Sequence, residues 1–259
     1  MKILQQPQKL PILSAGSGLI ALVLRLSLFR LGRDEKGLLI AGHPLDLLIW
    51  AVTAMAAVLI LISVRKLEGS SRYDDNLAPS AAASIGAFAL AGGIAVSVIL
   101  GGSAGLRLDL LCRIAGAVAV PSIIWAGICR YTGKKPFFLF HGAVCLYLTL
   151  YSISHYQTWS SHPQIQDWFF SMAGALSLTL FSYYQTAFCT ELVNHRMQIL
   201  TGLLAGFFCI AAAAGGNDML LYIGGALWSL TNLCNLTPVS RRRKNPIAED
   251  GKDLPHETA

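Results

Sequence analysis

The chain has 259 residues, of which 54% are hydrophobic and 13% are charged, and its formal net charge is +6. Soluble globular proteins carry about 25% charged residues, so this chain lacks the polar material that coats a water-soluble surface; its mean hydropathy is +0.55. The composition excludes disordered, coiled-coil, collagen-like and disulfide-scaffold proteins. It predicts an all-α, polytopic membrane protein without a separate soluble domain.

Eight segments are apolar enough to be membrane-spanning helices, each of which takes about 20 residues. In chain order they cover residues 10–31, 44–64, 80–100, 108–129, 136–156, 167–190, 199–214 and 218–236. The seventh is the shortest and therefore the weakest of the eight. No segment alternates polar and apolar residues with a period of two over ten residues, so we expect no strands.

The distribution of lysine and arginine predicts the orientation, because cytoplasmic connections are enriched in these residues. If both termini lie in the cytoplasm, fourteen of the basic residues fall on the cytoplasmic side, including the Arg-Arg-Arg-Lys run after the last helix. We therefore predict eight passes through the cell (plasma) membrane with both termini cytoplasmic. Residues 1–238 are expected to form one transmembrane domain, and residues 239–259 a disordered cytoplasmic tail.

Charged side chains inside apolar segments are the first candidates for a binding site, because each is costly in lipid unless it is paired or hydrated. Arg25 lies about five residues inside the outer end of the first helix. Arg113 lies one turn inside the fourth helix, four residues after Asp109, so these two side chains can pair along one helix face. This pattern predicts an outer vestibule that binds an anion or a small zwitterion. The alternative is that both arginines extend toward the lipid headgroups.

The fifth helix is the most polar, and two lines of polar side chains follow it. One line is His141, Cys145, Thr149, Ser152 and Tyr156; the other is Tyr147, Tyr151 and His155. Inside a membrane such side chains face other helices or water. They predict either the wall of a solute path or a set of hydrogen bonds between helices.

Cofactor and metal chemistry find little support in the sequence. No metal-ligand spacing or CxxC motif occurs, and all six cysteines fall within the predicted helices. His141 and His155 have the spacing of ligands to two stacked haems, but matching histidines at membrane depth on a second helix are missing. We expect no cofactor, no metal ion, no nucleic acid and no disulfide.

Small residues on the third and seventh helices indicate close helix packing. They are Ala83, Ala87, Ala91 and Ala95 on the third helix, and Gly202 and Gly206 on the seventh. Besides the lipid bilayer, these faces are expected to contact neighbouring helices, a second copy of the chain or a partner membrane subunit.

The leading functional hypothesis is the binding or translocation of a small solute, by a transporter or by the membrane subunit of one. Glycine-rich helices and the polar fifth helix favour it. The alternative is a non-transporting membrane protein with an assembly, regulatory or sensor role, which the absence of a carboxylate at mid-membrane depth favours. A third hypothesis is an intramembrane enzyme that acts on lipid.

Overall fold

The computed structural model describes residues 10–33, 39–40, 43–65, 67, 79–100, 106–160, 168–191, 195–215 and 218–234. These residues form eight α-helices and one short 3-10 helix, with no strand among them beyond a single bridge between Arg33 and Leu39. In chain order the helices are α1 (Leu10–Leu31), α2 (Pro44–Arg65), α4 (Ala81–Leu100), α5 (Leu106–Thr132), α6 (Phe138–Ser160), α7 (Phe169–Cys189), α8 (His195–Ala212), the 3-10 helix η4 (Ala213–Gly215) and α9 (Met219–Cys234).

The predicted all-helical fold is confirmed, and a helix occupies each of the eight predicted segments. Six helices are long and apolar enough to cross a membrane, namely α1, α2, α4, α5, α6 and α8. The helix α9 has only 16 residues, and α7 carries several tyrosine, serine, threonine and glutamine side chains that lower its hydropathy. The predicted tail, residues 239–259, lies outside the described residues.

The prediction that the seventh segment is the shortest was wrong. Its helix begins at His195 and continues through η4 to Gly215, over 21 residues. The first turn contains His195, Arg196 and Gln198. A search for apolar segments omits such polar residues. They nevertheless extend the helix, because backbone hydrogen bonding in a helix does not depend on the polarity of the side chains.

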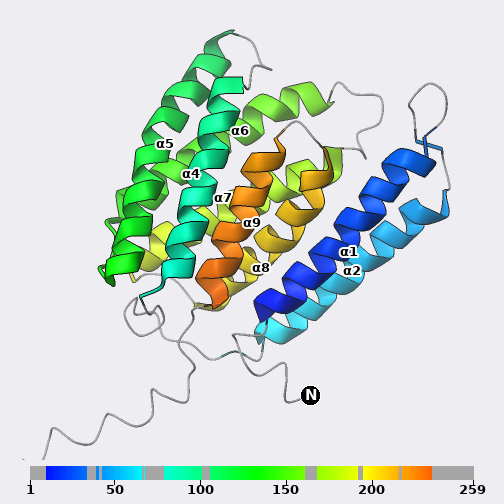
Figure 1. Ribbon diagram of the computed structural model, residues 1–259, viewed down its shortest axis with the longest axis horizontal. Coiled ribbons are helices and arrows are strands. Elements are labelled where there is room, and N and C mark those ends of the chain that lie inside the picture. Colours follow the sequence, from blue (N-terminus) through cyan, green and yellow to red (C-terminus); the bar gives the residue numbers. More distant parts are fainter. Residues whose placement is uncertain are drawn as a thin grey trace, which may run out of the picture.

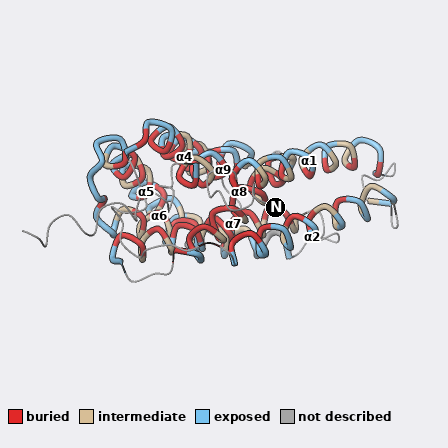
Figure 2. The backbone as a smooth tube through the Cα atoms, turned by 90° about the horizontal axis from the view of Figure 1, so that it is seen from below, coloured by how far each residue is buried: buried red, intermediate tan, exposed pale blue. Residues whose placement is uncertain are grey.

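Consecutive helices run in opposite directions and define two ends of the molecule (Figure 1). We call the end where α1, α4, α6 and α8 terminate the upper end, and the opposite end the lower end. The helices α4 to α9 form a six-helix body. The helices α1 and α2 form a hairpin that packs mainly against α8 and extends beyond this body (Figure 2).

Glycine permits a close backbone contact between α4 and α9. A Cβ atom at Gly93 of α4 would lie 2.6 Å from the carbonyl oxygen of Leu220, and one at Gly224 of α9 would lie 2.6 Å from that of Ala89. Only a residue without a Cβ allows two backbones to approach so closely.

Most of the small residues predicted to form packing faces are buried against other helices of the same chain. On α4, Ala83, Ala87 and Ala91 are buried. On α8, Gly202 faces Phe181 of α7 and Leu233 of α9, while Gly206 faces Leu230 and Ser14. These residues thus contact neighbouring helices, which is one of the alternatives that the sequence left open.

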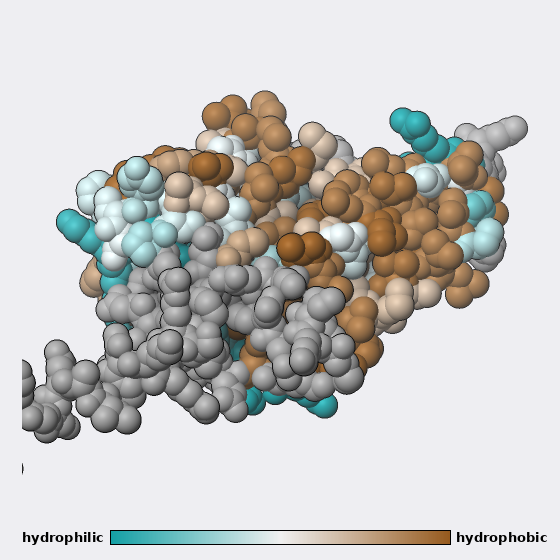
Figure 3. All heavy atoms as spheres, turned by 60° about the horizontal axis from the view of Figure 1, so that its bottom comes forward, coloured by the Kyte–Doolittle hydropathy of each residue, from teal (hydrophilic) through white to brown (hydrophobic). Residues whose placement is uncertain are grey.

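Large apolar side chains point outward along the helices. Leu47 of α2 is 71% exposed and Ile99 of α4 is 72% exposed. Apolar side chains also cover most of the face that the α1–α2 hairpin presents in Figure 3. A contiguous apolar exterior of this kind is unfavourable in water and favourable in lipid. The fold is therefore that of a membrane-embedded helical protein.

Candidate functional site

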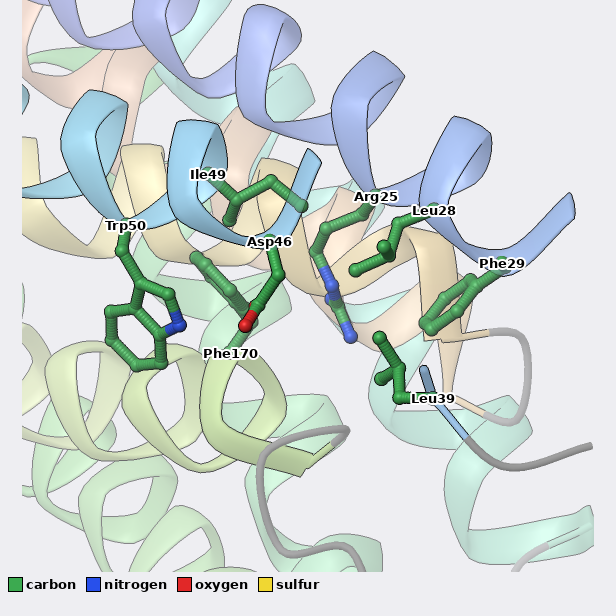
Figure 4. Close-up of a pocket in the computed structure, with 8 residues that line it drawn as sticks. All are labelled: Arg25, Leu28, Phe29, Leu39, Asp46, Ile49, Trp50 and Phe170. Carbon is green, nitrogen blue, oxygen red and sulfur yellow. The ribbon is translucent and has the colours of Figure 1, made fainter. Parts of the chain in front are cut away.

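A small pocket lies near the upper end, at the seam between the hairpin and the body (Figure 4). Three helices and the segment after α1 form its walls. The lining residues are Arg25, Leu28, Phe29, Leu39, Asp46, Ile49, Trp50 and Phe170. An apolar wall with a few polar groups is the usual construction of a site for a small molecule.

Arg25 is the buried cation of this pocket, with 3% of its surface exposed. Its Nη1 donates a hydrogen bond of 2.6 Å to the carbonyl oxygen of Ala211, in the last turn of α8. Its guanidinium carbon also lies 5.1 Å from the ring centre of Phe29 and 4.8 Å from that of Phe170. A cation at the carboxyl end of a helix interacts favourably with the helix dipole. Arg25 therefore ties α1 to α8.

Asp46 supplies the opposite charge. It lies in the first turn of α2, where its backbone N–H donates to the carbonyl oxygen of His43 at 3.0 Å. The Asp46 carboxylate and the Arg25 guanidinium extend into the same space (Figure 4). The cavity volume is about 20 Å³, which is room for about one water molecule. In this conformation the pocket is therefore too small for larger solutes.

The predicted pair on α5 forms, but at a distance from the pocket. Arg113 Nε donates to Asp109 Oδ2 at 2.9 Å, and the two side chains are 44% and 26% exposed. The helix α5 lies on the side of the body opposite the hairpin that carries Arg25 (Figure 1). The structure thus does not bring the two arginines into one vestibule.

The first polar line of α6 does not surround one space. His141 is buried and stacks on Trp228 at 6.0 Å between ring centres. Cys145 is half-buried, with Sγ 3.8 Å from the carbonyl oxygen of Thr179. Thr149 is exposed and Ser152 half-buried, and Tyr156 is 52% exposed.

The hydroxyl groups of this line are satisfied within their own helix. Thr149 Oγ1 donates to the carbonyl oxygen of Cys145, and Ser152 Oγ donates to that of Leu148. Serine and threonine commonly bond in this way to the residue four positions earlier. These two positions therefore need neither water nor a second helix.

The second polar line of α6 faces the interior of the body near the upper end. Tyr147 and Tyr151 are both 1% exposed. The ring of Tyr151 stacks on that of His155 at 3.9 Å. The Tyr151 hydroxyl lies 3.4 Å from that of Tyr222, which in turn donates to the carbonyl oxygen of Ser171. Because the single hydrogen of Tyr222 is used in that bond, Tyr151 is the donor to Tyr222.

An acidic residue completes this upper network. Asp218, directly before α9, accepts a hydrogen bond from Ser97 Oγ of α4 at 3.2 Å. Its other carboxylate oxygen lies 3.6 Å from His155 Nε2. His155 Nδ1 lies 3.0 Å from the carbonyl oxygen of Tyr151, and a carbonyl oxygen only accepts, so Nδ1 carries a hydrogen. Asp218 therefore lies beside both the His155 ring of α6 and the Ser97 hydroxyl of α4.

The upper network was only partly visible in the sequence. The spacing of Tyr147, Tyr151 and His155 marked them as one line, and Asp218 was recognisable as a helix-start residue. No sequence pattern linked Asp218 to His155, which precedes it by 63 positions.

Metal and disulfide chemistry have no support in the described part of the chain. No group of three or more histidine, cysteine, aspartate or glutamate side chains there is arranged to hold a metal ion. All six cysteines lie within that part, and all are free thiols.

Comparison with known proteins gives no relative: no family model matches the chain, and no curated protein or solved structure matches it significantly.

Proposed function

We propose that the protein binds a small polar solute at the pocket between Arg25 and Asp46 and moves it across the plasma membrane, alone or as the membrane subunit of a larger system. In this proposal all eight helices cross the bilayer, both termini are cytoplasmic, and the upper end faces outward. The observation that carries the proposal is the presence of two opposite charges on the wall of one largely apolar pocket.

The charges of the pocket favour a zwitterion. The guanidinium of Arg25 matches the geometry of a carboxylate, while the carboxylate of Asp46 suits an ammonium group. Such a solute compensates both side chains and brings no net charge into the seam. A simple anion compensates only Arg25 and lies close to the carboxylate of Asp46, which repels it.

Entry of a solute requires the seam to widen, because the cavity of about 20 Å³ is far below the 300–1,000 Å³ or so of typical ligand sites. The arrangement of the helices permits this movement. The hairpin contacts the body mainly through α8, so a rigid tilt of α1 and α2 opens the pocket without repacking the interface between α4 and α9.

Ligand-dependent stabilisation of the purified protein tests the proposal. The probes are the common amino acids and betaine, with acetate and methylammonium as single-charge controls. A ligand at about 100 times its Kd stabilises the folded state by about 2.7 kcal/mol. We expect at least one zwitterion to raise the unfolding temperature, and Asp46→Asn to abolish that increase.

The matched control is Asp109→Asn, which removes the same charge from the first turn of α5 and should preserve the increase. The absence of any stabilising zwitterion, or an unchanged increase in Asp46→Asn, contradicts the proposed solute site.

A second candidate function is a non-transporting assembly, regulatory or sensor protein. The observation that favours it is the bond between Arg25 and the carbonyl oxygen of Ala211, which gives this arginine a structural role without any solute. Under this alternative, Arg25 and Asp46 variants change stability, while no small solute stabilises the wild-type protein.

A further inference from the structure

Two contacts define how α7 and α8 face each other near the lower end. The ring centre of Phe188 on α7 lies 6.1 Å from that of His195 on α8. Two turns higher, a Cβ at Gly202 of α8 would lie 2.8 Å from the ring of Phe181 on α7. Because the helices are antiparallel, these two contacts establish the register of the residues between them.

Two glutamines lie opposite each other in this register. On α7, Gln185 lies four residues after Phe181, the upper contact residue, and three before Phe188, the lower one. Gln198 has the matching position on α8, three residues beyond the lower contact residue and four before the upper one. They therefore occupy the same level of the facing helix surfaces.

Both glutamines are buried, and each has an amide atom without a partner. Gln185 is 2% exposed and Gln198 is 1% exposed. Within the part of the chain that the structure describes, Gln185 Nε2 and Gln198 Oε1 lack a hydrogen-bond partner. One atom is a donor and the other an acceptor.

A third polar atom lies on the adjoining helix. Ser182 Oγ of α7 donates to the carbonyl oxygen of His141 at 3.0 Å, which brings the start of α6 against α7 one turn from Gln185. His141 is 5% exposed, and its Nδ1 also lacks a partner among the described residues. The lower parts of three helices thus each contribute an unpartnered polar atom.

Such atoms are rare in native proteins, because a buried polar group without a hydrogen bond is costly and is normally satisfied by protein or ordered water. We propose that the lower ends of α6, α7 and α8 form a second polar site, which binds a neutral molecule able both to donate and to accept hydrogen bonds. Water and a small amide solute share this chemistry. Gln198 is the fourth residue of α8, about 5 Å from the helix start, so the site lies near the lower end.

This inference does not depend on the solute pocket near the upper end, because the two sites share no residue. Neither glutamine is among the residues that line that pocket. A failure of the zwitterion experiment leaves the lower site unaffected.

A double-mutant cycle tests the site through stability. Gln185→Leu and Gln198→Leu retain much of the side-chain volume and remove the hydrogen-bonding groups. If an occupant bridges the two amides, each substitution raises the unfolding equilibrium constant about tenfold, equivalent to about 1.4 kcal/mol. The double variant then shows less than the product of the two effects. Ser122→Ala, which removes a hydroxyl bonded only within α5, is the control.

The opposite result overturns the proposal. If the region is dry, leucine removes an uncompensated buried amide, so both single variants match or exceed wild-type stability.

A second measurement uses the folded wild-type protein and keeps the test valid if a variant fails to fold. In lipid bilayers, water-edited solid-state NMR of protein labelled with ¹⁵N-glutamine detects magnetisation transfer from water to the Gln185 amide. Gln185→Met, or failing that Gln185→Glu, assigns the peak.

Transfer that persists in the presence of acetamide supports water as the occupant. Transfer that acetamide suppresses, together with a higher unfolding temperature, supports an amide solute. The absence of both transfer and acetamide stabilisation overturns the site.

Discussion

Arg25→Met removes the guanidinium that ties the hairpin to the body and leaves most of the aliphatic stem in place. The substitution eliminates the 2.6 Å bond to the carbonyl oxygen of Ala211. It also eliminates the contacts of the cation with the rings of Phe29 and Phe170. The carbonyl oxygen at the end of α8 then loses a donor and a favourable charge.

The magnitude follows from these contacts. A hydrogen bond from a charged group contributes about 1.5–3 kcal/mol, and a desolvated cation–π contact contributes about 2 kcal/mol. Contributions that share one side chain are not additive, and removal of the buried charge recovers part of its desolvation cost. We therefore expect Arg25→Met to lower the free energy of unfolding by about 3 kcal/mol.

Reversible unfolding in mixed micelles, followed by tryptophan fluorescence, measures this loss. The matched control is Arg113→Met, because its ion pair with Asp109 is 44% and 26% exposed, and such surface pairs contribute about 0–1 kcal/mol. A loss below about 0.5 kcal/mol in Arg25→Met, or equal losses in both variants, would refute the assignment of Arg25 as the anchor of the hairpin.

Two further predictions concern the six-helix body. Gly93→Ala should destabilise it by about 1–3 kcal/mol, because the new Cβ would lie 2.6 Å from the carbonyl oxygen of Leu220. The control is Gly92→Ala, whose Cβ enters open space and should preserve stability. Equal unfolding free energies for the two variants argue against the close approach of α4 and α9. Asp218→Asn and His155→Gln should be coupled by about 0.5–3 kcal/mol in a double-mutant cycle, since the Asp218 carboxylate lies 3.6 Å from His155 Nε2. Additive losses exclude the pairing.

The positions of the helices could be predicted because lipid imposes both a length and an apolar character on a spanning segment. The first segment was predicted to cover residues 10–31, and α1 is Leu10–Leu31. The start of α8 could not be found in this way. His195 and Gln198 look like connection residues in a hydropathy count, yet they are 6% and 1% exposed, because polarity alone does not distinguish a side chain that faces protein from one that faces water.

The candidate site was predictable only where a single residue stood out. Arg25 attracted attention because a charge within an apolar segment is costly. Its partner, the carbonyl oxygen of Ala211, lies 186 positions away and has no side-chain pattern to reveal it.

The sequence did not show which face of α6 is buried. Both polar lines of α6 had helical spacing, and the buried one is that of Tyr147 and Tyr151. Which face of a helix is buried depends on its neighbours. The Thr149 hydroxyl did not indicate the buried face, because it bonds to a carbonyl oxygen of its own helix.

The sidedness of three connections tests the central claim, a bundle of eight membrane-crossing helices, most directly. Lys135 and Glu191 form an ion pair of 2.7 Å at the lower end, whereas Arg33 follows α1 at the upper end. In a variant without native cysteines, Lys135→Cys, Glu191→Cys and Arg33→Cys are labelled separately with an impermeant maleimide. We predict that the first two react only from the cytoplasmic side and the third only from outside. Reaction of Glu191→Cys from outside would contradict the crossing of both α6 and α7.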